Sequence, residues 1–236
     1  MKALYFDNSL PRIVMVQAAS LFYGYAALLP FSTTRYAEVP EPEIPNPRWL
    51  KVRNMACGLC GSDIHFMFME MDPKCFPAAT PGIARKYLGH ELIGEVMEVG
   101  DDVGGFQKGD RVCLRIDWPS CFQMEMNPMC PQCAQGEYML CQNLGARNLP
   151  LIDVGGGFSP RMVMHKTQPF KVPDGLSNDE ALMLEPMACA VHAVSKHLPA
   201  AGDRVLVVGC GTIGLLTVAA VKAMVKDAEV IALARY

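Results

Sequence analysis

The first part of the chain carries a hydrophobic pattern typical of short β-strands. Four prolines between positions 37 and 53 exclude a helix there and favour an extended segment that leads into a strand at 49–52. In 92–99 the apolar positions are interrupted by Gly94, and glycine-containing turns precede a second apolar run at 111–114. These features predict a β-rich, barrel-like region.

The pattern changes after Pro173, where Ser177 and Glu180 have the spacing of a capping box at a helix start. It then predicts helices at 179–184, 188–197 and 215–225, a buried strand of the parallel type at 204–208, and a second strand at 230–233. Alternating helices and strands indicate an α/β domain built on a parallel sheet. We therefore assign residues 1–187 to a first domain and residues 188–236 to the start of a second.

One uncharged run, residues 13–34, is long enough to be mistaken for a membrane span. It includes Gln17, Gly24 and Pro30, and Asp7 rather than a basic cluster precedes it, unlike a signal peptide. We expect a buried strand followed by a loop or short helix packed on the first domain. Membrane insertion is the alternative.

Composition and charge limit the kinds of molecule that this protein is expected to bind. With 51% hydrophobic residues, the 236-residue chain is globular rather than disordered. A formal net charge of −3 gives no electrostatic basis for binding nucleic acid or an anionic membrane, so we expect small-molecule partners. Several of the ten cysteines have Cys-x2-Cys spacing, which favours metal binding in a reducing compartment. We expect a cytoplasmic protein.

A set of metal-binding residue types occurs in order along the chain. Cys60 opens the sequence Cys-Gly-Ser-Asp-Ile-His, His90 and Glu91 are adjacent, and Glu185 precedes a proline. One thiolate, one imidazole and one or two carboxylates, with a position left open for water or substrate, suit a catalytic zinc. We predict Cys60, His90 and Glu91 as ligands and Glu185 as a fourth. Taken singly, His90 could be a core residue and Glu185 could simply start a helix.

Cys57 and Cys60 also have the spacing of a dithiol redox motif, which is the alternative role for Cys60. The strand and helix that flank such a motif are missing from the surrounding pattern. We interpret Cys57 as a small buried residue, and likewise the other isolated cysteines, at positions 75, 113, 189 and 210.

A glycine-rich turn follows the predicted strand at 204–208. A Gly-x-Gly-x-x-Gly sequence between a strand and a helix predicts a nicotinamide dinucleotide site, with the helix N-terminus facing the phosphates. The candidate residues are Gly209, Gly211, Thr212, Ile213 and Gly214. About 20 residues on, where a carboxylate would bind the ribose and select NAD, the chain has Ala234 followed by Arg235, so we predict NADP over NAD. The alternative is that Arg235 is a solvated loop charge.

These motifs, in this order, resemble the zinc-dependent medium-chain alcohol dehydrogenases, and most nearly the sorbitol and threonine dehydrogenase branch, where Glu directly follows the metal-binding His. The resemblance covers residues 37–236, and 13–34 looks like an insertion. It implies a GroES-like β-barrel domain with two zinc sites, followed by a Rossmann domain. It also implies that Ser62 takes the alcohol proton and passes it through the cofactor ribose toward His65, while Asp63 supports a zinc ligand.

The resemblance extends to a structural zinc lobe. Cys130, Cys133 and Cys141 match its Cys-x2-Cys-x7-Cys tail, whereas the family's first cysteine corresponds to Asn127 here. Cys121 is the nearby replacement, because a loop of that length can bring it back at modest entropic cost. We expect four thiolates in a closed tetrahedral site, and a three-cysteine or empty lobe is the alternative.

The implied activity is reversible hydride transfer between a zinc-bound secondary alcohol or polyol, or its ketone, and NAD(P). Since only the opening of a Rossmann domain is present, we expect a fragment of a longer enzyme with little turnover, and a homo-oligomer when full length. The alternative is a non-enzymatic protein whose zinc sites serve folding or thiol sensing.

Overall fold

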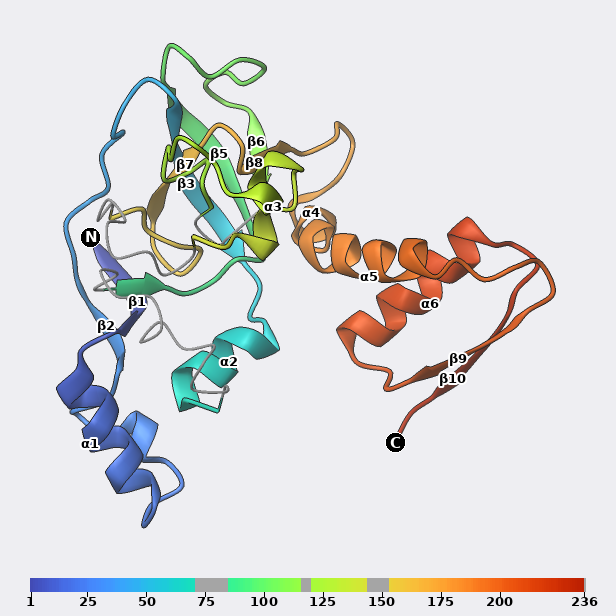
Figure 1. The fold of residues 1–236 in the computed structure, drawn as a ribbon, viewed down its shortest axis with the longest axis horizontal. Coiled ribbons are helices and arrows are strands. Elements are labelled where there is room, and N and C mark those ends of the chain that lie inside the picture. The colour runs from blue at the N-terminus through green and yellow to red at the C-terminus, as the bar shows by residue number, and fades with distance from the viewer. Residues whose placement is uncertain (71–84, 116–119, 144–152, 236) are drawn as a thin grey trace. The chain divides into compact units, whose positions relative to one another are not determined.

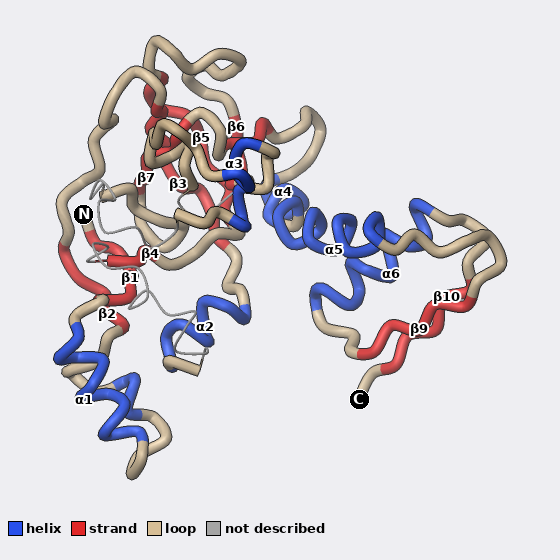
Figure 2. The backbone as a smooth tube through the Cα atoms, in the orientation of Figure 1, coloured by secondary structure: helices blue, strands red, loops and turns tan. Residues whose placement is uncertain are grey.

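The computed structural model describes residues 1–70, 85–115, 120–143 and 153–235, and the chain forms two compact units (Figures 1 and 2). Unit 1 is Met1–Leu176 and unit 2 is Ser177–Tyr236. Helix α5 (Leu184–Lys196) belongs to unit 2 and packs on a later helix of that unit, and the assignment of residues 1–187 and 188–236 to two domains stays a prediction.

A five-stranded antiparallel sheet forms the main core of unit 1. Its strands, in spatial order, are β7 (Arg161–His165), β3 (Trp49–Cys57), β5 (Leu92–Val99), β6 (Arg111–Leu114) and β8 (Pro169–Lys171). Alternate positions such as Leu50, Val52 and Val96 are fully buried in one hydrophobic cluster. Gly94 lets strands β3 and β5 approach, since a Cβ there would lie 2.3 Å from Val52 Cγ1. The predicted strands at 49–52, 92–99 and 111–114 are confirmed.

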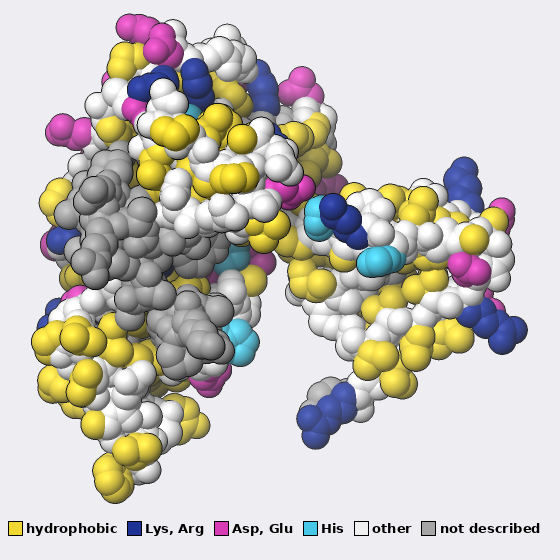
Figure 3. All heavy atoms as spheres, viewed as in Figure 1, with side chains coloured by type: hydrophobic (Ala, Val, Ile, Leu, Met, Phe, Trp, Pro, Cys, Tyr) yellow, Lys and Arg dark blue, Asp and Glu magenta, His cyan; other side chains and the backbone are white. Residues whose placement is uncertain are grey.

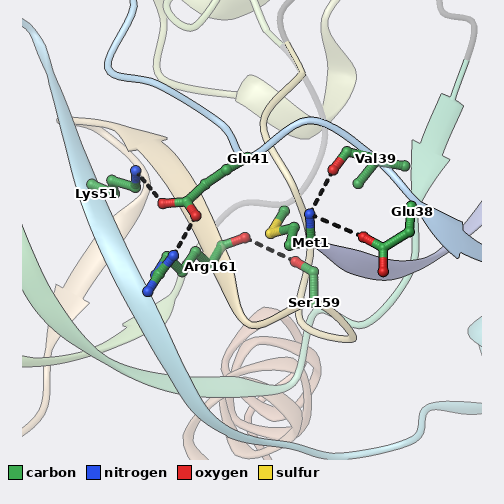
Figure 4. Close-up of polar contacts among 7 residues, drawn as sticks. All are labelled: Met1, Glu38, Val39, Glu41, Lys51, Ser159 and Arg161. Carbon is green, nitrogen blue, oxygen red and sulfur yellow. Dashed lines mark hydrogen bonds and ion pairs between the residues drawn. The ribbon is translucent and has the colours of Figure 1, made fainter.

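A second, three-stranded sheet contains the N-terminal strand. Its order is β2 (Thr34–Glu38), β1 (Lys2–Asp7) and β4 (Arg85–Tyr87), all antiparallel. Side-chain contacts connect the proline-rich segment after β2 to the five-stranded sheet: the Glu41 carboxylate pairs with Lys51 Nζ of β3 at 2.6 Å and with Arg161 of β7 (Figure 4). The Met1 ammonium donates to the Val39 carbonyl at 2.7 Å.

The strand predicted in the uncharged run is wrong. Residues Leu10–Ser20 form helix α1, and a short 3-10 helix, Ala26–Leu28, follows. Pro11 stands in the first turn, where a helix tolerates it, and the buried Ile13 and Val16 lie three residues apart, on one helical face. Other apolar side chains of this segment are exposed, including Phe22, and hydrophobic surface is visible over α1 in Figure 3. Among the described residues, no helix is long and apolar enough to cross a membrane.

Unit 2 is a βαβ unit preceded by two helices. Its elements are α4 (Asn178–Leu182), α5, β9 (Arg204–Val208), α6 (Thr212–Met224) and β10 (Glu229–Leu233). Strands β9 and β10 pair in parallel, and a core containing Ala190, Val194, Ala220 and Val221 forms where α5 packs on α6. The predicted capping box is confirmed, because Ser177 Oγ accepts from Glu180 N at 3.2 Å. The chain therefore begins a doubly wound parallel sheet in unit 2.

Candidate active site and zinc lobe

Three predicted zinc ligands meet in unit 1. The candidate ligand atoms of Cys60, His90 and Glu91 all lie within 4.8 Å of one another, and each residue is half-buried. Cys60 caps the N-terminus of helix α2 (Gly61–Phe68), while His90 and Glu91 immediately precede strand β5. A helix start and a strand start thus bring together one thiol, one imidazole and one carboxylate, which is a donor set that zinc accepts.

The Asp63 side chain contacts two of these three residues and the backbone beside them. Its carboxylate accepts from Gly89 N at 2.9 Å and from Cys60 N at 3.2 Å, and Oδ1 lies 3.6 Å from His90 Nδ1. Burial alone would raise the pKa of this carboxyl, but the interactions with His90, Gly89 and Cys60 outweigh it and hold the pKa below its usual value. With Nδ1 facing Asp63, Nε2 of His90 is the nitrogen left for a metal.

Glycines make room for the ligands. A Cβ at Gly58 would lie 2.5 Å from Glu91 Oε2, so the glycine leaves the space that the Glu91 side chain occupies. Gly89 has a φ of +84°, and its amide reaches Asp63 in that conformation.

The two predicted proton-transfer residues lie on α2. Ser62 Oγ is 3.4 Å from His90 Nε2, at the ligand set. His65 is exposed in the last turn of α2, where its Nδ1 lies 3.0 Å from Glu70 Oε2. The local sequence around Glu70 carries no signal that its side chain would contact His65.

Glu185 is in unit 2, in the first turn of α5, where Cys189 Sγ lies 3.7 Å from its Oε1. Its role as a fourth ligand stays a prediction.

Cys189 is exposed, so its interpretation as a buried residue is wrong: it lies outside the α5 face that buries Ala190 and Val194. Cys113 is buried as expected, Cys57 and Cys210 are half-buried, and Cys75 lies outside the described residues.

The second cysteine cluster also assembles. The sulfur atoms of Cys121, Cys130, Cys133 and Cys141 lie within 4.8 Å of one another; Cys121 and Cys133 are almost fully buried, and Cys130 and Cys141 are less than a tenth exposed. Cys130 begins the short helix α3 (Pro131–Ala134), and Cys141 follows the 3-10 helix Tyr138–Leu140. The upstream loop thus places Cys121 beside the three cysteines of the Cys-x2-Cys-x7-Cys segment.

Amide donors surround these sulfurs. Cys130 N donates to Cys121 Sγ and Cys133 N to Cys130 Sγ, each at 3.4 Å, and Asn143 Nδ2 donates to Cys121 Sγ at 3.2 Å. The amide of Cys133 lowers the pKa of the Cys130 thiol to about 6, while burial raises that of Cys133 to about 12. Sequence reasoning missed Asn143, whose only signal is its position two residues after Cys141.

The lobe is attached to the sheet through Glu125. Its carboxylate accepts from Asn46 Nδ2 at 2.6 Å, from Arg48 Nη2 at 2.5 Å and from Trp49 Nε1 at 3.4 Å. Glu125 has a φ of +52°, so the loop between Cys121 and Cys130 turns sharply at this residue. A single side chain thereby connects the cysteine loop to the start of β3.

The glycine-rich turn in unit 2 lies between strand β9 and helix α6, the context that the motif requires. Gly209 has a φ of +98°, and a Cβ at Gly214 would lie 1.8 Å from the Gly209 carbonyl oxygen, so α6 packs directly on the turn. A Cβ at Gly211 would meet nothing within 4 Å, which leaves its backbone open to a ligand. Gly209 N donates to Leu233 O at 2.9 Å, so the residues after β10 begin beside the turn. Thr212 and Ile213 form the first turn of α6, and Arg235 is exposed.

Comparison with known proteins gives the family. Residues 46–174 match the alcohol dehydrogenase GroES-like domain. The chain is 36% identical to (R,R)-butanediol dehydrogenase of Bacillus subtilis over 80% of its length, and 35% identical to sorbitol dehydrogenase of Halalkalibacterium halodurans over 76%. The crystal structure of a putative zinc-binding dehydrogenase from Sinorhizobium meliloti 1021 bound to NADP is 32% identical and superposes on 86% of this chain and 53% of its own with a TM-score of 0.63.

The chain therefore belongs to the zinc-dependent medium-chain alcohol dehydrogenase family, with a GroES-like unit followed by the first part of a Rossmann fold. It spans about half the length of the curated relatives that it matches, 51% of the butanediol dehydrogenase and 47% of the sorbitol dehydrogenase.

Proposed function

We propose that this protein is a zinc-dependent oxidoreductase that transfers a hydride between a secondary alcohol or polyol, or the corresponding ketone, and NAD(P). The observation that carries the proposal is the convergence of Cys60, His90 and Glu91, with Asp63 facing Nδ1 of His90. The relatives named as butanediol and sorbitol dehydrogenases support this substrate class.

The donor set fits a catalytic zinc. Three protein ligands of mixed type leave a coordination position for substrate, in contrast to the four sulfurs of the lobe, which would close a structural site. A zinc ion bound by Cys60, His90 and Glu91 supplies Lewis acidity that lowers the pKa of a coordinated alcohol. We include Glu185 as a further ligand or one that exchanges with water.

The protein's own groups would then handle the proton. Ser62, whose Oγ lies beside His90 Nε2, would accept the alcohol proton, and His65 would receive it at the end of the proton path. Asp63 holds His90 and the Cys60 amide in place and does not itself exchange a proton.

NADP is the cofactor that we favour. The open backbone at Gly211 and the N-terminus of α6 suit a pyrophosphate, and Arg235 follows β10, where a carboxylate would select NAD.

We also propose a cytoplasmic location, on the ground that the described cysteines are free thiols, and a homo-oligomer for the active enzyme.

Cobalt substitution tests whether the Cys60 site is open. Co²⁺ bound to a thiolate absorbs in the visible range, and a secondary alcohol such as butane-2,3-diol should shift that absorption in the native chain. The matched variant Cys60→Ser keeps the lobe cysteines, so its cobalt spectrum should not respond to the alcohol. The non-enzymatic alternative, in which this metal serves only the fold, would be favoured by either of two results. One is a cobalt absorption of the native chain that does not change when the alcohol is added, and the other is a Cys60→Ser chain that unfolds.

A further inference from the structure

The structure fixes Glu70 next to His65. Nδ1 of His65 and Oε2 of Glu70 are 3.0 Å apart. The backbone sets this proximity: Met69 adopts a left-handed conformation with a φ of +57° at the C-terminus of α2, and Glu70 N then donates to His65 O at 2.9 Å. The chain therefore turns back at the end of the helix, which brings the side chains of His65 and Glu70 into contact.

This contact selects one form of the imidazole. A carboxylate only accepts hydrogen bonds, so Nδ1 of His65 must carry the proton and Nε2 is left with a free lone pair. We propose that Glu70 is a positioning residue that holds neutral His65 as the Nδ1–H tautomer, which makes Nε2 the atom that receives the substrate proton. The inference rests on the proposed function, in which His65 ends the proton path.

The proton balance closes without another reactant. The proton released by the substrate hydroxyl binds Nε2, and the resulting imidazolium is stabilised by the negative charge of Glu70. Both side chains are more than half exposed, at 58% and 57%, so water can remove the proton from Nε2 and restore the neutral Nδ1–H form.

Nitrogen-15 NMR of the imidazole rings tests the proposal in the full chain. The sequence has five histidines, and His65→Asn identifies the signals of His65 by their loss. At a pH where the ring is neutral, the native chain should show mainly Nδ1–H, and Glu70→Ala should lower the ratio of Nδ1–H to Nε2–H by about two- to fivefold, as expected for an exposed pair. Glu43→Ala, on the exposed proline-rich segment, is the control and should leave the ratio unchanged.

A native His65 that is mainly Nε2–H, or a ratio that Glu70→Ala does not change, would overturn the proposal. The measurement requires neither turnover nor bound metal. Its failure is therefore distinguishable from failure of the proposed function, which the cobalt experiment detects at Cys60.

Discussion

At the scale of single residues, Asp63 connects the parts of the candidate active site. Its buried carboxylate accepts hydrogen bonds from the backbone amides of Cys60 and Gly89 and faces His90.

Asp63→Asn would put an amide NH2 against one of these N–H donors and remove the negative partner of the imidazole. Zinc affinity at the Cys60 site should fall about 10- to 100-fold, measured by chelator competition. Asp101→Asn, at an exposed turn, should leave it unchanged; equal affinity in both variants would contradict this role of Asp63.

His165 gives a pH-dependent contribution to stability. It is buried against Trp49, and burial lowers its pKa from 6.5 to about 4. Between these values the unfolded chain binds a proton that the folded chain does not, so the free energy of unfolding should fall as the pH is lowered from 6.5 to about 4. Denaturant titrations of the native chain and of His165→Gln should show the shallower pH dependence in the variant. Parallel curves would show that His165 does not titrate in this way.

At the scale of elements, the glycine-rich turn offers a matched pair of substitutions. Gly214→Ala would place a methyl group 1.8 Å from the Gly209 carbonyl and force α6 away from the turn, whereas Gly211→Ala points into open space. We expect Gly214→Ala to destabilise unit 2 by about 1–3 kcal/mol and Gly211→Ala by much less. Gly211→Ala should still weaken NADP binding, because the ligand approaches that backbone. Thermal unfolding and NADP titration separate the two effects, and equal stability losses would contradict the packing argument.

Regular elements were predictable where local pattern and packing agree. The capping box at Ser177 forms as its sequence indicates, and strand β5 buries the apolar positions of its pattern. The prediction that β9 is a buried strand is wrong, because Val207 is buried but Leu206 and Val208 are 60% and 72% exposed. Helix α1 was not predicted, because an uncharged run offers little contrast between buried and exposed faces, and only the burial of Ile13 and Val16 in the folded unit reveals its helical period.

The candidate site was predictable as a set of residue types but not in its supporting contacts. Cys60, His90 and Glu91 are identified by their order, since zinc chemistry restricts the choice of ligands. Glu125, Asn143 and Glu70 act through tertiary proximity or a helix end, and their local sequences carry no corresponding signal.

At the scale of the whole molecule, the two candidate metal sites and the candidate dinucleotide-binding turn belong to different units. Both cysteine-containing sites lie in unit 1, and the glycine-rich turn lies in unit 2. Metal content should therefore report mainly on unit 1, with Glu185 as the one proposed ligand from unit 2, and the two sites can be distinguished by removing one cysteine from each.

Zinc per chain, by elemental analysis of protein purified without added metal, tests the account most directly. The native chain should contain about two zinc ions, and Cys60→Ser and Cys121→Ser should each contain about one, while Cys210→Ser, outside both sites, should retain two. A native chain without zinc, or a Cys60→Ser chain that still binds two ions, would contradict the assignment of a catalytic zinc to Cys60, His90 and Glu91.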